Sequence, residues 1–170
     1  MKMQTTALAT ALILGALASN AMAAGTATPT DRAFVAKVSQ GGMFEVEASK
    51  VAAQKASTQD VRDFATSEVH DHQLVGAKLF KISASEGIYF ASSLNKEFDA
   101  KLQHLKSLSG PDFDSAYMTE MASIHDADGA AFADEATNGG SDEFKAFANE
   151  THTIVLRHIG AIHAAPPPAN

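Results

Sequence analysis

The sequence predicts an all-α protein, a bundle of four long helices with a short fifth helix in the connection between the second and the third. Apolar residues recur alternately three and four positions apart through most of the chain, which is the spacing of one helix face. No segment alternates apolar and polar residues as a half-buried strand does. Turn signals divide the pattern into two pairs of segments joined by one long connection, and this division predicts four helices in two hairpins.

The first pair of helices is predicted at residues 31–56 and 58–86. Thr30 is the candidate cap of the first helix, and Ser57 with Asp60 resembles a capping box at the start of the second. The inner positions of the first helix are Phe34, Val38, Gly41, Glu45, Ala48 and Ala52. Those of the second are Val61, Ala65, Glu68, His72, Val75, Leu79 and Ile82.

The second pair follows a connection of about two dozen residues, which is long for a helix–helix link and contains an amphipathic helix at 94–108. Pro111 opens the third helix, which runs to 137, and Ser141 caps the fourth. The inner positions of this pair are Met118, Met121, His125, Asp128 and Phe132, followed by Phe144, Phe147, Thr151, Ile154, His158 and Ala161. The long crossover favours the ferritin-like arrangement over a simple up-down-up-down bundle.

The N-terminus has the pattern of an export signal over residues 1–23. Lys2 precedes an apolar run at 7–18, and the small–x–small sequence at 21–23 predicts cleavage before Ala24. The apolar run, on the order of a dozen residues, is too short for a membrane anchor. The remaining boundaries are a leader at 24–30, the bundle at 31–163 and a proline-rich tail at 164–170. We therefore expect a periplasmic protein with no transmembrane anchor.

Composition excludes several classes of function. The chain has 13 basic and 20 acidic residues and a formal charge of −7, without the basic patch that nucleic-acid binding needs. It contains no cysteine, so its fold uses no disulfide. Nucleophile elbows, phosphate loops and dinucleotide fingerprints are also missing from the sequence. An enzyme with an open metal position would need a pocket that reaches the histidines of the inner helix faces.

Four ionisable residues interrupt the apolar inner faces, one on each long helix: Glu45, His72, His125 and His158. Buried ionisable groups are costly unless they are paired or bound to a metal. Counted from the turns of the two hairpins, Glu45 and His72 lie at depths of about 17 and 22 Å, and His125 and His158 at about 21 and 28 Å. Because side chains lean toward the N-terminus of their helix, the four can meet at one level of the bundle.

Three imidazoles and a carboxylate suit a single transition-metal ion such as zinc, iron, copper or nickel. Glu68 and Asp128 lie on the same inner faces and could be additional ligands or orient an imidazole. Asp71 points about 100° away from His72 around the helix, so we do not include it in the site. The alternative is a metal-free structural or interaction module of the cell envelope with a buried Glu–His network.

Three segments of the chain resemble an exported bacterial family called domain of unknown function 4142 (DUF4142), which is placed in the ferritin-like superfamily. They are residues 41–46 (GGMFEV), 71–72 (DH) and 105–117 (LKSLSGPDFDSAY). The resemblance covers about residues 31–163, and His125 and His158 fall where that family has its histidines. It implies the fold and the export, and it carries no activity.

The ferritin-like resemblance raises the question of a di-iron centre. Such a centre needs Glu-x-x-His on two of the four helices. Here Val69 stands three positions before His72 and Val155 stands three before His158. The carboxylates that bridge two irons are therefore missing, and the sequence predicts one mononuclear site instead.

Overall fold

A computed structural model describes residues 27–164, and every regular element within this range is a helix. The helices are α1 (Pro29–Lys55), α2 (Gln59–Ser85), α3 (Lys96–Ser107), α4 (Gly110–Asn138) and α5 (Asp142–Ala164). The predicted all-α class and the four long helices are confirmed. None of the helices in the described range is long and apolar enough to cross a membrane.

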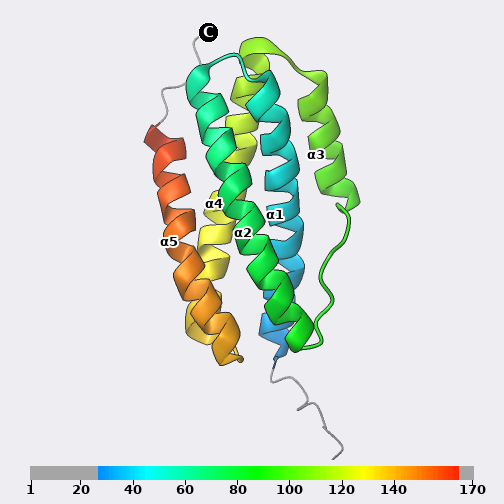
Figure 1. The fold of residues 1–170 in the computed structure, drawn as a ribbon, viewed down its shortest axis with the longest axis vertical. Coiled ribbons are helices and arrows are strands. Elements are labelled where there is room, and N and C mark those ends of the chain that lie inside the picture. Colours follow the sequence, from blue (N-terminus) through cyan, green and yellow to red (C-terminus); the bar gives the residue numbers. More distant parts are fainter. Residues whose placement is uncertain (1–26, 165–170) are drawn as a thin grey trace, which may run out of the picture.

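Four of the helices form a bundle (Figure 1). Helices α1 and α2 form one antiparallel hairpin and α4 and α5 form the other, while α1 also packs on α4 and α2 on α5. The crossover returns along the length of the bundle, so that α2 and α4 run in the same direction. Helix α3 lies in this crossover against the outside of α1, where Phe98 stacks on Phe44 with ring centroids 5.0 Å apart. The two hairpins and the helix-containing crossover are as predicted.

The first helix begins two residues earlier than predicted. Its cap is Thr28 rather than Thr30, and Thr28 forms a capping box with Asp31. The Asp31 backbone N–H donates to the Thr28 hydroxyl over 3.4 Å, and the Asp31 carboxylate accepts from the Thr28 backbone N–H. Pro29 fits the first turn because a residue there needs no N–H donor. The predicted leader at 24–30 therefore extends two residues too far.

Helix α2 is capped by Thr58 and not by Ser57. Ser57 and Thr58 both bind the carboxylate of Asp114 on α4, with the Ser57 backbone N–H donating over 2.9 Å and its hydroxyl over 2.7 Å. This contact was not visible in the sequence, because Asp114 is distant along the chain. The other helix ends lie within about two residues of their predicted positions, which is the usual disagreement at helix ends.

The buried apolar residues form two clusters, one toward each end of the bundle. The first includes Phe44, Ala52, Ala65, Leu105, Phe113 and Tyr117. The second includes Phe34, Val38, Leu79, Phe132, Phe144 and Phe147. Glu45, Glu68, His72, His125 and His158 lie between residues of the two clusters along their own helices. The predicted signal peptide at 1–23 and the tail beyond 164 lie outside the described residues.

Candidate metal centre

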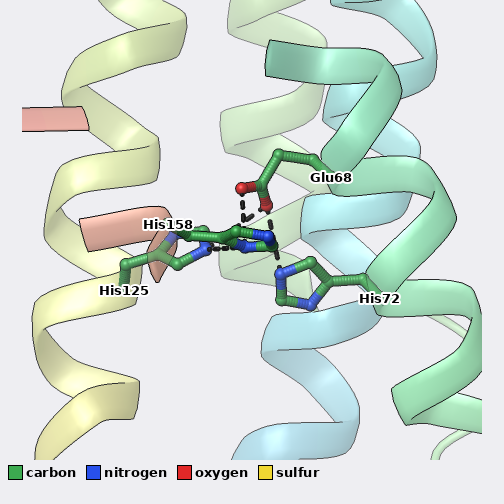
Figure 2. Close-up of side chains that lie close together, drawn as sticks. All are labelled: Glu68, His72, His125 and His158. Carbon is green, nitrogen blue, oxygen red and sulfur yellow. Dashed lines mark hydrogen bonds and ion pairs between the residues drawn. The ribbon is translucent and has the colours of Figure 1, made fainter. Parts of the chain in front are cut away.

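Glu68 and three histidines meet in the middle of the bundle. Glu68 and His72 come from α2, His125 from α4 and His158 from α5. Each residue offers one ligand atom, and these atoms all lie within 4.8 Å of one another. Figure 2 shows the three imidazoles gathered beside the Glu68 carboxylate. All four residues are buried, so water does not solvate the group as it would on the surface.

The Glu68 carboxylate is in contact with one nitrogen of every ring. Its Oε2 lies 3.1 Å from His72 Nε2 and 3.3 Å from His125 Nε2, and its Oε1 lies 2.8 Å from His158 Nδ1. The His125 and His158 nitrogens are 3.2 Å apart. A tetrahedral zinc ion with bonds of about 2.0–2.1 Å holds its ligand atoms about 3.3–3.4 Å apart. The four contacts above are close to this value or shorter, while the ligand atoms as a set lie within 4.8 Å of one another.

The contacts of Glu68 are short, but they are not well-directed hydrogen bonds. Neither Glu68 oxygen accepts a hydrogen bond of good geometry from the described residues, and His72 Nε2 also has no such partner. Buried polar atoms are nearly always hydrogen-bonded. The other two inward atoms, His125 Nε2 and His158 Nδ1, are hydrogen-bonded to each other over 3.2 Å. Unsatisfied atoms that face a common point, as those of Glu68 and His72 do, are typical of metal ligands.

The outward nitrogen of each ring has its own acceptor. These contacts are His72 Nδ1 with Glu45 Oε2 at 3.1 Å, His125 Nδ1 with the Met121 carbonyl at 2.9 Å, and His158 Nε2 with Asp71 Oδ2 at 2.9 Å. A proton held on the outward nitrogen leaves the lone pair of the inward nitrogen free. Metal-binding histidines characteristically have such an outer acceptor, which fixes the tautomer and the ring orientation.

The negative carboxylates and the positive imidazolium ions of the centre stabilise one another and shift one another's pKa values. Burial alone would raise the pKa of Glu68, but its short contacts with the three histidines hold that pKa well below its ordinary value. Burial alone would lower the pKa of His72, but Glu45 and Glu68 raise it to about 9. Without an ion, protons on the imidazoles therefore neutralise the two glutamates. A metal ion that binds here must displace those protons.

The structure brings together the three predicted histidines and exchanges the expected positions of two glutamates. Glu68, expected as an additional ligand or an orienting group, lies at the centre of the cluster. Glu45, expected as a ligand, lies on the outer side, with Oε1 also 3.3 Å from His125 Nδ1. The direction in which each side chain leaves its helix decides which glutamate reaches all three histidines. The spacing of residues along the sequence does not reveal that direction.

Asp128, the other candidate ligand, lies outside the cluster. It is buried, but it forms no ion pair with any histidine of the described helices. Its carboxylate instead faces α1, where a Cβ added to Gly41 would lie 3.3 Å from Oδ2. Burial and the neighbouring charge of Glu45 raise the pKa of Asp128 to about 7.

Asp71 contacts the cluster from outside, although its direction on α2 predicted no part in the site. It does point away from His72, but this direction takes it to α5, where it contacts His158 and is paired with Arg157. The signal in the sequence is its position three residues after Glu68, on the side of α2 next to that residue. Recognising it requires knowing that α5 is the neighbour of α2 on that side.

Two comparisons with known proteins give matches. The family described as "Domain of unknown function (DUF4142)" matches residues 16–164. A crystal structure of a DUF305 fragment from Deinococcus radiodurans is similar in fold, with a TM-score of 0.70, 14% sequence identity, and coverage of 81% of this chain and 95% of that one. At this identity the similarity concerns the fold alone. No curated protein matches the sequence.

Proposed function

This chain belongs to the DUF4142 family, whose name assigns no activity, and we propose that its bundle binds one transition-metal ion through Glu68, His72, His125 and His158. The observation that carries the proposal is the convergence of four buried ligand atoms from three helices within 4.8 Å. Glu45 and Asp71 would orient His72 and His158 from outside the ligand set. The role is binding rather than turnover.

Charge balance favours a divalent ion. The centre contains two buried carboxylates, Glu45 and Glu68, and neutral imidazoles add no charge. One divalent ion therefore neutralises the pair. The donors are nitrogen and oxygen with no sulfur, which suits zinc, iron, copper or nickel. A di-iron centre is not proposed, because Val69 and Val155 stand where its bridging carboxylates would be.

Elemental analysis of the untagged protein, before and after incubation with each metal, tests this proposal. We expect about one equivalent of metal in the loaded wild-type protein and less than about a tenth of an equivalent in His158→Ala and Glu68→Gln. His104→Ala is the matched control, because His104 is exposed on α3 and should leave the metal content unchanged. A wild-type protein that takes up less than about a tenth of an equivalent of every metal contradicts the proposal.

The competing interpretation is a metal-free Glu–His network that fixes the register of the helices. The raised pKa of His72 and the lowered pKa of Glu68 favour it, because protons can neutralise the buried carboxylates without an ion. Under this interpretation His125→Ala changes the stability of the bundle and leaves the metal content at its background level. The same elemental analysis therefore separates the two functions.

We also propose that the protein is exported to the periplasm. The support is the basic, apolar and small-residue pattern of residues 1–23. N-terminal sequencing of protein from a periplasmic fraction should begin at Ala24. Recovery of the chain from the cytoplasm with Met1 in place would contradict export.

The acidic composition supports a protein that does not bind nucleic acid.

A further inference from the structure

A cavity of about 220 Å³ lies beside the metal centre, on the side of Glu45 and His72. Its walls are formed mainly by apolar side chains from all four long helices, among them Val38, Val75, Leu79, Phe132, Ile154 and Val155. Exposed Gln73 and Ala77 stand at its mouth, while Ser39, Glu45 and Asp128 are buried deep within it. The cavity therefore runs from the surface of the bundle to a polar floor.

The floor of the cavity contains buried polar atoms without hydrogen bonds. Ser39 Oγ has no hydrogen-bond partner in the described structure, although Ser39 is only 3% exposed, and the buried oxygens of Glu45 have only the ion-pair contacts with His72 and His125. Such atoms are rare in folded proteins and need a reason. Glu45 contacts His72 and His125 on one side, but Ser39 belongs to no part of the metal centre. A ligand with hydrogen-bond donors would satisfy these atoms.

The charge of the lining points to the kind of head group. Three carboxylates line the cavity, those of Glu45, Glu47 and Asp128, and none of the lining residues is lysine or arginine. His72 adds a positive charge in its protonated form, and Glu47 is paired with Lys50 outside the lining, which leaves Glu45 and Asp128 as the buried carboxylates. An anionic ligand would be repelled, whereas a primary ammonium group carries three donors and the complementary charge.

Two glycines keep the cavity open. Gly42 and Gly76 lie in the middle of α1 and α2 and line the cavity, and a Cβ built on either would meet no atom within 4 Å. Glycine in the interior of a helix is less stable than a residue with a side chain. Close packing of the helices does not explain these two glycines, because there is room for a side chain at both positions. Their absence preserves space.

We propose that this cavity binds a small primary ammonium ion with an apolar tail. The ammonium group lies at Ser39 and Glu45, and the tail lies among Val75, Leu79 and Phe132. A dry cavity of about 150 Å³ holds a benzene molecule, so this cavity has room for a ligand of about ten non-hydrogen atoms. Phenethylammonium has this size and chemistry. The ammonium site shares Glu45 with the metal centre, but it requires no metal ion there.

Calorimetric titration of the full chain with phenethylammonium tests the proposal, using metal-free and zinc-treated protein in parallel. We expect saturable binding with one site, at least about tenfold tighter than that of ethylammonium, which lacks the tail, or of 2-phenylethanol, which lacks the charge. Equal affinity for 2-phenylethanol would contradict the ammonium class. No binding in either preparation would overturn the whole proposal, and a failure of zinc binding alone would leave it intact.

Two variants locate the ligand in the cavity. Gly76→Leu fills the open space and should weaken phenethylammonium binding at least about tenfold, with the helical circular dichroism unchanged. Gly160→Leu is the matched control, since Gly160 is an exposed glycine within α5 whose added Cβ also meets no atom within 4 Å. Ser39→Ala should weaken binding of the ammonium ion without affecting 2-phenylethanol. Unchanged affinity in Gly76→Leu would show that the ligand binds elsewhere.

Discussion

Each histidine of the centre has one nitrogen turned inward to Glu68 and one turned outward to an acceptor. The outward acceptors are of three kinds: the Glu45 carboxylate for His72, a backbone carbonyl for His125, and the Asp71 carboxylate for His158. Because a neutral imidazole has one donor and one acceptor nitrogen, these contacts decide which lone pair is available. The outer residues should therefore affect how tightly the site binds a metal ion, although none of them is a proposed ligand.

Asp71→Asn tests this role at the level of one atom. We expect the variant to bind metal about 10–100-fold more weakly than the wild type, because an amide orients the His158 ring less well and makes it less basic. Competition titration with a chromophoric chelator measures the affinity. Asp63→Asn, an exposed change on the same helix, should keep wild-type affinity. An unchanged affinity in Asp71→Asn would contradict the orienting role.

At the scale of the helices, carboxylates tie the helix ends together. Asp114 of α4 accepts from the backbone and side chains of Ser57 and Thr58 at the start of α2. At the opposite end, Asp31 of α1 accepts from the backbone N–H of Gly140 over 2.9 Å. A Cβ at Gly140 would lie 2.0 Å from Thr28, so this close approach requires glycine. Each of these carboxylates joins one hairpin to the other.

Glu135 of α4 is buried beside Asp31, and neither of its oxygens receives a hydrogen bond from a donor in the described structure. Burial and the hydrogen bond with Asp31 raise the pKa of Glu135 to about 8. Burial alone would raise the pKa of Asp31, but hydrogen bonds from Glu135, Thr28 and Gly140 lower it to about 2. Glu135 therefore holds the proton of the pair, and the folded protein retains it at a pH where the unfolded chain has lost it.

Stability should consequently fall as the pH rises from about 4.5 to 8, because the unfolded state binds fewer protons than the folded state over that range. Glu135→Gln keeps a permanent donor and removes this titration. We expect urea unfolding to show that the variant gains about 3.5 kcal/mol on the wild type between pH 5 and pH 8, both without metal. Glu143→Gln, an exposed change on α5, should show no such gain. A gain that does not vary with pH would contradict the shared proton.

Across the whole molecule, the metal centre lies between two apolar clusters and connects helices of both hairpins. The clusters supply the bulk of the buried apolar surface at the two ends, and the centre replaces apolar packing with ionisable groups at mid-length. The ligands belong to α2 in one hairpin and to α4 and α5 in the other. An ion bound there would hold the hairpins together in the folded state only.

Metal binding should therefore raise the melting temperature. At a free metal concentration 100 times the Kd, the stabilisation is about 2.7 kcal/mol, which corresponds to roughly 8–10 °C for a domain of this size. Thermal unfolding followed by circular dichroism measures the shift, and a chelator should reverse it. His158→Ala should show no shift under the same conditions. An equal shift in this variant would mean that the ion stabilises the protein from another site.

Much of the fold and part of the site could be predicted from single residues. The three- and four-residue spacing of apolar positions gave the helices, and His72, His125 and His158 were recognised because each interrupts such a seam. The helix caps were less predictable, since Thr28 and Thr30 offer the same hydroxyl and only the backbone path distinguishes them. The binding of a metal by these residues, the identity of the metal and the export signal all stay predictions.

By itself, the sequence determined the helical class, the two hairpins with their crossover, and the gathering of histidines at one level, because periodicity along one helix sets which residues face inward. The tertiary structure decided that Glu68 rather than Glu45 lies among the three histidines, that Asp71 supports His158, and that Ser39 and Glu45 face a cavity. The physical reason is that these facts depend on which helices are neighbours and how their side chains lean. The spacing of residues along a single helix shows neither the neighbours of that helix nor the direction of its side chains.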